Sequence, residues 1–530
     1  MKSQAIGNSS RADSPGPGRI ARAGHWAVRG AALCAFCAVF GQGCEVGPDY
    51  RRPATAMPAA WGEGDRAATS RPASLAMWWR SFQDPVLDRL IDESIAGNLT
   101  LRQAQESLLQ ARAQRRIAAA AFWPTVTANA SYQRLGFGSG GAGAAGTSAI
   151  GGASRGTGRT ATGGGAAASG GGESTTELNL FQAGFDATWE LDVFGKVRRS
   201  VEAADATAAA AAEDLRNTLV SLLAEVATNY VQLRGYQRQL QIAKENLRAQ
   251  NETLRLTREQ FNAGAVDGLS VAQAAAQAAT TAAAIPVLEA SIRQTMHILS
   301  VLCGRQPMEL AELATGAGPV PSGPPRVPAG LPSTLLRRRP DIRGAERRLA
   351  AATASIGVAV ADLYPQFSFT AGIGQQSTEL STFFDKANRF WSFGPNMSWT
   401  IFEGGAIRAN IDLVTSQQRQ AAVLYQQTVL TAMQEVEDAL VALAKERAHN
   451  EALAAAVEAD RRTLELSRQL YLLGRASFLN VLAAQAALLN AQTALAQSDT
   501  ALATDLVALY KALGGGWEGQ TGVLPPEGRH

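Results

Sequence analysis

The sequence predicts an α+β membrane protein in which four two-faced strands are joined to two exceptionally long helices. Three observations predict this fold. Between Phe181 and Val193 every second residue is apolar and those between are mostly polar, as in a strand with one dry and one wet face. The surrounding chain is rich in alanine and leucine at helical spacing. The whole pattern of strands and helices then occurs a second time along the chain.

The composition excludes several classes of function. The 530 residues carry a formal net charge of only +3, and no basic stripe predicts a nucleic-acid partner. The 4 histidines show no metal-ligand spacing, so we expect no metal, no cofactor and no enzymatic activity. The strings GAGAAG at 141–146 and GASRG at 152–156 imitate nucleotide-binding and hydrolase motifs, but neither stands between a strand and a helix.

The N-terminus has the features of an export signal at 1–43. Basic residues precede an apolar run at 31–40, which is long enough for a signal and too short to span a bilayer. Gly43 and Cys44 then resemble a lipoprotein cleavage site, which makes Cys44 the predicted lipidated first residue. Because the leucine usual three residues before such a cysteine is Gly41 here, an ordinary signal remains the alternative.

An internal repeat organises the rest of the chain. A shift of 210 residues superposes Trp189 on Trp399 and Gly264 on Gly474, and the first copy contains an additional glycine-rich tract at 136–172. We expect this tract to be an outer loop between two strands. The predicted parts are a lipidated extended segment (44–84), a first repeat (85–317), a proline-rich connector (318–334), a second repeat (335–514) and a C-terminal tail (515–530).

Each copy is expected to hold two strands, one long helix and one returning helix. The strands are about as long as the roughly 9 to 11 residues that cross a bilayer. Leucine, valine and phenylalanine recur every seven residues along the first long helix, which predicts supercoiled packing over about 100 Å. The predicted strands are 124–133, 179–194, 365–375 and 391–402; the long helices are 197–262 and 407–472; the returning helices are 269–302 and 479–512.

The strands also predict how the chain meets a membrane. Beyond residue 44 we expect no apolar run of the length that a membrane helix needs, so a crossing must be made by strands. Four strands cannot close a barrel, and open edges cannot face lipid. Two chains would supply 8 strands and three would supply 12, which begins to leave a lumen. The sequence therefore predicts an oligomeric conduit, most simply a trimer.

Four motifs carry a family resemblance over the mature chain. They are GCEVGPDYRRP (43–53), DPVLDRLIDESIAGNLTLRQA (84–104), LLRRRPDIRGAERRLAAA (335–352) and IFEGGAIRANID (401–412). The chain resembles the TolC-type outer-membrane efflux proteins, in the lipoprotein branch that works with resistance-nodulation-division pumps. This resemblance implies a homotrimeric 12-stranded barrel, lipid-anchored in the cell outer membrane, with an α-helical tunnel in the periplasm. It also implies a passive duct that docks to a periplasmic adaptor and an inner-membrane pump.

The resemblance further implies functional residues. The turn at Gly474, with Arg475 and Ser477, resembles the adaptor-docking tips, as does the turn at Gly264, which lacks the Arg-x-Ser sequence. The segment QEVEDAL (434–440) resembles the one that narrows the tunnel, which implies that Asp438 and Tyr425 form the periplasmic aperture. The alternatives are plain helix caps at the glycines and an ordinary helix-surface acid at Asp438.

Other functions remain compatible with these patterns. One is the outer component of a type I protein secretion system, which shares the fold. Another is a lipid-anchored periplasmic spacer without a pore, although a spacer needs no lipid-facing sheet. The exported substrate, expected to be a drug or another toxic compound, is not specified by the sequence because fold does not determine cargo.

Overall fold

The structure, a computed structural model, describes residues 45–62, 75–137, 176–315, 318–324, 330 and 332–525. The predicted signal peptide, the predicted lipidation site Cys44 and the glycine-rich loop from residue 138 onward lie outside the described residues. The chain divides into two compact units. One holds the sheet with the neighbouring helix ends (119–199 and 357–408), and the other holds most of the helices.

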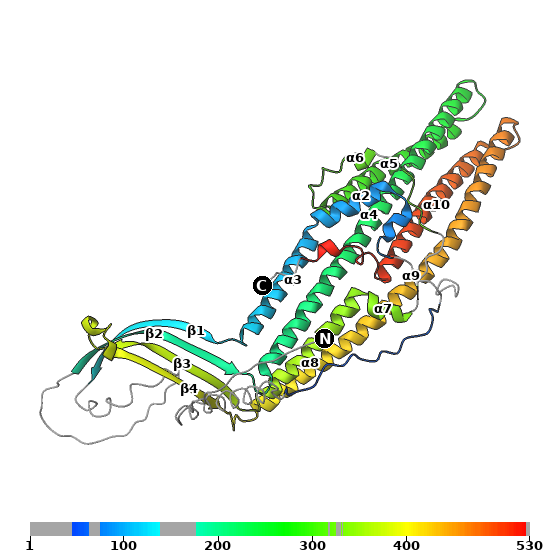
Figure 1. The fold of residues 1–530 in the computed structure, drawn as a ribbon. Helices are drawn as coiled ribbons and strands as arrows, with labels where there is room; N and C mark the ends of the chain where they lie inside the picture. Colours follow the sequence, from blue (N-terminus) through cyan, green and yellow to red (C-terminus); the bar gives the residue numbers. More distant parts are fainter. Residues whose placement is uncertain are drawn as a thin grey trace, which may run out of the picture. The chain divides into compact units, whose positions relative to one another are not determined.

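The two halves of the chain contain the same elements in the same order (Figure 1). The first half holds α2 (Pro85–Gly97), α3 (Leu99–Ala120), β1 (Thr125–Phe137), β2 (Thr176–Leu191), α4 (Lys196–Asn262) and α5 (Gly268–Leu302). The second half holds α7 (Pro332–Arg338), α8 (Pro340–Ala361), β3 (Gln366–Ser377), β4 (Arg389–Ser398), α9 (Ala406–Leu472) and α10 (Phe478–Ala512). The short helices are η2 (Trp78–Phe82), α6 (Glu312–Thr315), η3 (Leu380–Thr382), η4 (Lys386–Asn388) and η5 (Thr521–Val523).

Corresponding helices of the two halves also have equal lengths. The long helices α4 and α9 have 67 residues each, and the returning helices α5 and α10 have 35 each. Each long helix forms an antiparallel hairpin with its returning helix (Figure 1). At about 1.5 Å per residue, each long helix extends about 100 Å.

The four strands form one antiparallel sheet in the order β1-β2-β3-β4. The strand register places most of the large apolar residues on one face, where Phe185 lies opposite Ile373 and Ile373 lies opposite Trp391. The other face is mostly polar near the helices, where Asn129 Nδ2 donates to Asp186 Oδ2 at 2.6 Å, and carries Leu178, Leu180 and Phe390 farther from them. The alternation in the sequence therefore corresponds to two chemically distinct sheet faces. Large apolar side chains remain exposed on the apolar face within this single chain, including Trp391 at 71%.

The fourth strand is shorter than the sequence predicts. It was expected to reach residue 402, but β4 ends at Ser398. Its partner β3 begins at Gln366, which pairs with Ser398, so the residues after Ser398 have no strand partner in this sheet. Gly404 and Gly405 then turn the chain toward α9 with φ of 59° and 89°, a backbone region that favours glycine.

The proline-rich connector is also shorter than predicted. It was expected to run through residue 334, whereas α7 begins at Pro332. Proline is well suited to the first turn of a helix, because its missing N–H would have had no intrahelical partner there and its fixed φ is already helical. The described part of the connector before this helix, residues 318–324, contains no helix or strand.

The heptad pattern is buried over only part of α4. Leu219, Val226 and Leu233 are almost fully buried in the main hydrophobic core, whereas Phe261, near the end of the helix, is 47% exposed. The core residues that pack with them come from α2, α9 and α10 and from the aromatic η2 segment. The regular spacing in the sequence therefore does not imply uniform packing within one chain.

The returning helices correct one expectation. By length and composition alone, α5 and α10 could cross a membrane, so the prediction that no such run follows residue 44 was wrong on those criteria. Both helices nevertheless make polar contacts with the long helices. Gln485 of α10 donates to Thr253 of α4 at 3.0 Å, and Lys244 of α4 donates to Glu289 of α5 at 3.0 Å. Such cross-helix pairs favour a place among other helices rather than in lipid.

A buried polar network joins α2 to α4. Asp84 caps the N-terminus of α2 and accepts a hydrogen bond from the hydroxyl of Tyr230 at 2.6 Å. Arg234 Nε donates to the same hydroxyl oxygen at 2.9 Å. Burial, together with the bond to Asp84, raises the pKa of Tyr230, so its hydroxyl stays protonated and remains a donor to Asp84.

We predict that Tyr230→Phe lowers the stability of the purified protein by about 1–3 kcal/mol, because Asp84 and Arg234 each lose a buried partner. Thermal melting in detergent measures this effect. Tyr236→Phe is the matched control, since the Tyr236 hydroxyl makes no hydrogen bond to any described residue. Equal melting temperatures for the two variants would show that the network contributes nothing to stability.

Candidate aperture and docking tips

The segment Gln434–Leu440 of α9 presents chemically different faces. Val436 is fully buried in the main core. Asp438, on another face, is exposed, and its carboxylate accepts a hydrogen bond from Gln434 Nε2 at 3.3 Å. The segment is therefore fixed to the chain through its apolar residue and leaves the carboxylate of Asp438 open to solvent.

A buried arginine holds this segment from the side. The guanidinium of Arg339, which lies between α7 and α8, contacts Glu435 at 2.7 Å and Asp341 at 2.7 Å. It also donates to the carbonyl of Ala512, the last residue of α10, at 2.8 Å. Because an arginine presents several donors in a rigid plane, this single residue ties α9 to the start of α8 and the end of α10. Arg339 of the sequence motif LLRRRPDIR thus contacts the candidate aperture segment directly.

The structure does not bring Tyr425 and Asp438 together. Tyr425 is 1% exposed and belongs to the main core, where its hydroxyl lies 3.5 Å from Thr55 Oγ1 as the acceptor. The two residues are 13 positions apart on α9, which is about 20 Å along the axis and about 220° around it. The spacing of these two residues along a helix was already sufficient to predict that they lie on different faces of α9. The aperture hypothesis therefore depends on Asp438, and nothing in the structure supports a lining role for Tyr425. Asp438 itself lies 34 positions before Leu472, the last residue of α9, and is therefore about 50 Å from the turn rather than beside it.

The two hairpin turns share one backbone conformation. Gly264 and Gly474 have φ of +73° and +69°. In the first turn, the N–H of Gly264 donates to Phe261 and that of Ala265 donates to Gln260; in the second turn, Gly474 donates to Tyr471 and Arg475 donates to Leu470. These paired bonds form a Schellman motif, which satisfies carbonyls that the helix end leaves free. Both glycines therefore end their helices as the sequence predicts.

The side chains make the two turns different. In the first turn, Asp267 caps α5 by accepting from Ser270 N at 3.0 Å and Ser270 Oγ at 2.7 Å, and these bonds lower the pKa of its carboxyl group. In the second turn, Ser477 occupies the N-cap of α10 without a side-chain capping bond. Ser477 and Arg475 are both exposed, beside Leu472 and Leu473, which are 78% and 69% exposed. The second turn thus exposes both polar and apolar side chains to solvent.

A hydrogen bond that the sequence did not reveal links the two hairpins near their turns. The hydroxyl of Tyr471 donates to Gln260 Oε1 at 2.9 Å, and the Tyr471 ring contacts Phe478 at a centroid distance of 5.5 Å. Phe478 also belongs to a small apolar cluster with Leu482 and Ala274. No local pattern marks this pair, because Tyr471 and Gln260 belong to different halves of the chain. Together these contacts hold the two turns at a fixed spacing.

The first described residues are seated beside the sheet. Glu45, which directly follows Cys44, contacts Arg199 Nε at 3.3 Å, and Val46 N donates to the carbonyl of Phe194 at 3.2 Å. Arg199 also donates to the carbonyl of Val46 at 3.2 Å. Close to these residues, Phe194 stacks on Tyr364 at 4.7 Å. The chain just after the predicted lipidation site is therefore fixed where β2 passes into α4.

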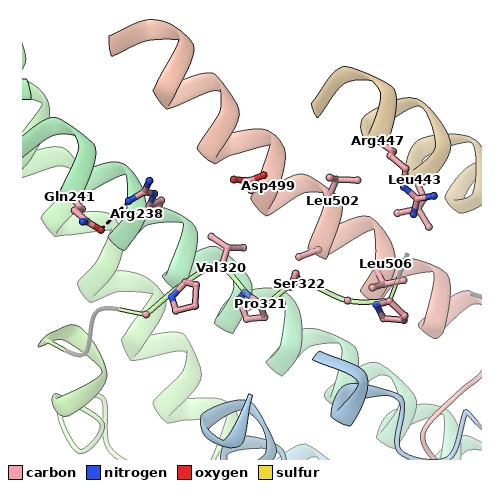
Figure 2. Close-up of a pocket in the computed structure, with 15 residues that line it drawn as sticks. Arg238, Gln241, Val320, Pro321, Ser322, Leu443, Arg447, Asp499, Leu502 and Leu506 are labelled. Atoms are coloured by element: carbon pink, nitrogen blue, oxygen red, sulfur yellow. Dashed lines mark hydrogen bonds between the residues drawn. The ribbon is translucent and has the colours of Figure 1, made fainter. Parts of the chain in front are cut away.

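A pocket of about 730 Å³ lies between the connector residues 318–324 and the helices α4, α9 and α10 (Figure 2). Its lining combines apolar groups such as Leu443 and Leu506 with Arg238, Arg447 and Asp499. No histidine or cysteine lines it, and among the residues the structure describes no cluster of metal-ligating side chains occurs.

We predict that Gly474→Ala destabilises the second turn by about 1–2 kcal/mol, because a residue with a Cβ strains this left-handed backbone. The added methyl group would meet no atom within 4 Å, so backbone strain is the whole cost. Hydrogen exchange of the amides around residue 474 measures the change. Gly268→Ala is the control, since Gly268 lies in α5 with ordinary helical backbone and an added Cβ would meet Phe261 at 3.7 Å. Unchanged exchange in Gly474→Ala would contradict the strain argument.

Comparisons with known proteins agree with this architecture. The family model for outer membrane efflux proteins matches residues 90–305 and 331–515, which together are more than half of the chain. The probable efflux pump outer membrane protein TtgC of Pseudomonas putida is 33% identical over 486 residues, or 91% of this chain and 94% of that protein. Nodulation protein T of Rhizobium leguminosarum bv. trifolii is 32% identical over 434 residues, or 82% of this chain and 86% of its own length.

Solved structures of outer-membrane channels are also similar to this chain. The outer-membrane channel OprN superposes with a TM-score of 0.79 at 36% sequence identity, covering 89% of this chain and all of that one. These matches confirm the resemblance inferred from the four sequence motifs, and they confirm the predicted location in the outer membrane. The chain belongs to the outer membrane efflux protein family, whose members are channels of the bacterial outer membrane.

Proposed function

We propose that three copies of this chain form a 12-stranded outer-membrane barrel continued by a helical tunnel in the periplasm. In this assembly the protein is a passive duct for solutes delivered by an inner-membrane pump through a periplasmic adaptor. The observation that carries the proposal is the sheet, which combines an exposed apolar face with two unpaired edges.

The two outer edges of the sheet, formed by β1 and β4, require hydrogen-bonding partners in a membrane. Within the described residues, β1 pairs only with β2, and β4 pairs only with β3, so one side of each outer strand has unpaired backbone groups. Such groups are costly in hydrocarbon, where no water can pair with them. If β4 of one copy pairs with β1 of the next, the barrel closes and its apolar face meets lipid. Three copies give 12 strands with the polar face, including Asp186, around a lumen.

The long helices supply the tunnel in this proposal. Three copies of α4 and α9, each about 100 Å long, are sufficient to reach deep into the periplasm. A threefold axis would bring three exposed Asp438 carboxylates toward one another, where their mutual repulsion favours bound cations. This is the basis for proposing Asp438 as the aperture. The main core holds Val436 on the same turn, which keeps the carboxylate in a defined direction.

The exposed turns are the proposed contacts for an adaptor. Gly474, Arg475 and Ser477 form the more open of the two turns, and the turn at Gly264 lies close to it through the Tyr471 bond. TtgC is named as an efflux pump outer membrane protein, which supports an efflux pump as a partner here. That this pump is of the resistance-nodulation-division class and acts through an adaptor is proposed from the family resemblance. Drugs or other toxic compounds are the proposed cargo.

We predict that Asp438→Ala increases the single-channel conductance of the purified trimer in planar bilayers and reduces its preference for cations. The reason is the loss of three like charges at one constriction. Glu451→Ala is the control, because Glu451 is another exposed carboxylate of α9 nearer the turn.

The outcomes separate the competing functions. Equal changes in both variants would contradict a local constriction at Asp438. A folded trimer without any conductance in either variant would favour the poreless spacer. A type I secretion component would conduct as well, so the cargo must be tested separately by export of a dye from intact cells, with and without co-expressed pump and adaptor.

The lipid anchor generates a separate prediction. We propose that Cys44 is the first residue of the mature chain, because Glu45 and Val46 are fixed at the junction of β2 and α4. Radiolabelled palmitate should then enter the wild-type protein and not the Cys44→Ser variant, and the intact mass should show a chain beginning at residue 44. Normal labelling of Cys44→Ser, or cleavage at another residue, would contradict this assignment.

A further inference from the structure

A second pocket, of about 410 Å³, lies beside the described N-terminal segment and is lined by residues of α4, α7 and α8. All of its lining residues belong to one compact unit of the chain. Four guanidinium groups and two carboxylates give this lining a formal net charge of +2. Because arginine binds oxyanions through several parallel N–H donors, the excess of arginine favours an anion as the ligand. The charged lining residues are Arg52, Arg337, Arg343, Arg347, Glu213 and Glu346.

One of the two carboxylates is shared by two arginines. Arg52 Nη2 contacts Glu346 Oε2 at 2.8 Å, and Arg347 Nη2 contacts Glu346 Oε1 at 2.8 Å. Glu346 is buried, whereas both arginine side chains are partly open to solvent. Since a guanidinium carries five N–H donors, each arginine retains donors for a second acceptor. Glu346 therefore brings two positive groups together and compensates only one of their charges.

Aromatic rings hold two of the guanidinium groups in place. The guanidinium of Arg343 lies over the Trp517 ring at 5.2 Å from its centroid, and that of Arg347 lies over the Tyr50 ring at 5.8 Å. Groups that are already fixed lose less conformational entropy when a ligand binds. The pocket is therefore built from positioned charges rather than from freely moving surface side chains.

The second carboxylate, that of Glu213, has one oxygen without a partner. Its Oε1 is contacted by Arg343 at 2.6 Å and by Arg216 at 2.5 Å. Its Oε2 is buried and accepts no hydrogen bond from any described residue, and the whole side chain belongs to a residue that is only 5% exposed. Buried oxygens of this kind normally accept a hydrogen bond. The pocket thus presents a hydrogen-bond acceptor beside its arginines.

Arg337 contributes a positive charge that the fold leaves uncompensated. It is exposed in the last turn of α7. Its neighbours Arg338 and Arg339 pair with Glu518 at 3.1 Å and with Asp341 at 2.7 Å. Within the described parts of the chain, no carboxylate lies within ion-pair distance of Arg337. Its guanidinium is therefore available to an anion in the pocket.

A suitable ligand needs negative oxygens for the arginines and one O–H for Glu213. Hydrogen phosphate has both, whereas sulfate carries no proton at neutral pH and would place a bare oxygen against the Glu213 carboxylate. We propose that this pocket binds a protonated phosphate group, free or as the terminal group of a larger molecule. Its negative oxygens contact Arg337, Arg52 and Arg347, and its hydroxyl donates to Glu213 Oε2. This inference is independent of the proposed barrel and tunnel, because every group belongs to one chain.

The first test compares two anions of similar size. Inorganic phosphate should raise the melting temperature of the purified full-length protein in detergent, and the effect should saturate with concentration. Sulfate at the same ionic strength should bind about tenfold more weakly, since it cannot donate to the buried carboxylate. Isothermal titration calorimetry measures the two dissociation constants.

The second test uses matched arginine variants. Arg337→Gln should weaken phosphate binding about tenfold, as the loss of one charge-assisted hydrogen bond implies. Arg348→Gln is the control, because Arg348 is similarly exposed but lies outside the pocket lining and pairs with Asp214 at 2.5 Å. This variant should bind phosphate as the wild type does.

The third test addresses selectivity. Glu213→Gln replaces the acceptor by an amide whose N–H groups can donate to sulfate, so sulfate binding should become about tenfold tighter. A purely structural role of Glu213 predicts no such gain. If Glu213→Gln does not fold, the comparison of phosphate with sulfate in the wild type and in Arg337→Gln decides the question.

A further comparison identifies the source of the phosphate group. Mixed micelles with phosphatidic acid present a phosphate monoester, and those with phosphatidylglycerol present a phosphodiester that lacks the proton. Stabilisation by inorganic phosphate that depends on Arg337 supports a soluble ligand, and the same dependence with phosphatidic acid alone supports a lipid headgroup. The inference is overturned if neither stabilises the protein, if sulfate and phosphate act alike, or if Arg337→Gln and Arg348→Gln bind phosphate equally.

Discussion

The rest of this structure depends on the backbone hydrogen-bonding groups at the two outer edges of the sheet. β1 and β4 each present one unpaired side, and the apolar face between them is too exposed for a chain alone in water. In the proposed assembly another copy pairs with these edges, which requires the ends of the sheet to be fixed accurately. The indoles of Trp189 and Trp399 provide this at corresponding positions, since each donates to a carbonyl that follows the preceding helix. These bonds tie the ends of β2 and β4 nearest the helices to the turns that precede β1 and β3.

The helical hairpins show how near-identical backbones acquire different chemistry. Both turns use a glycine with positive φ and the same Schellman bonds, because a long helix needs a way to reverse direction without leaving carbonyls unpaired. Only in the first turn does a polar side chain cap the following helix: Asp267 accepts a hydrogen bond from the N–H of Ser270. The second leaves Arg475 and Ser477 exposed. A partner that recognises both hairpins would consequently meet two distinct surfaces, held at one spacing by the bond between Tyr471 and Gln260.

Regular local patterns made much of the fold predictable. The alternation of apolar and polar residues predicted the strands, and the glycines at 264 and 474 predicted the ends of the long helices. The constant shift of 210 residues predicted that the two halves contain the same elements in the same order. The details of the candidate aperture were not predictable in the same way. Arg339 meets Glu435, and Gly62 meets Glu437, across separations that no periodicity encodes. The assignment of Tyr425 beside Asp438 came from family resemblance, although helical geometry places the two residues on different faces.

The contacts around Asp438 also bear on how a duct can be both stable and movable. Val436 is in the core and cannot leave it without losing apolar burial, whereas Glu435 and Glu437 are held by polar contacts near the surface. Polar contacts exchange readily for contacts with water, so their net cost of rupture is small compared with their strength in isolation. Because this turn lies within one continuous helix of 67 residues, a change in these polar contacts must move α9 with it or break its backbone hydrogen bonds.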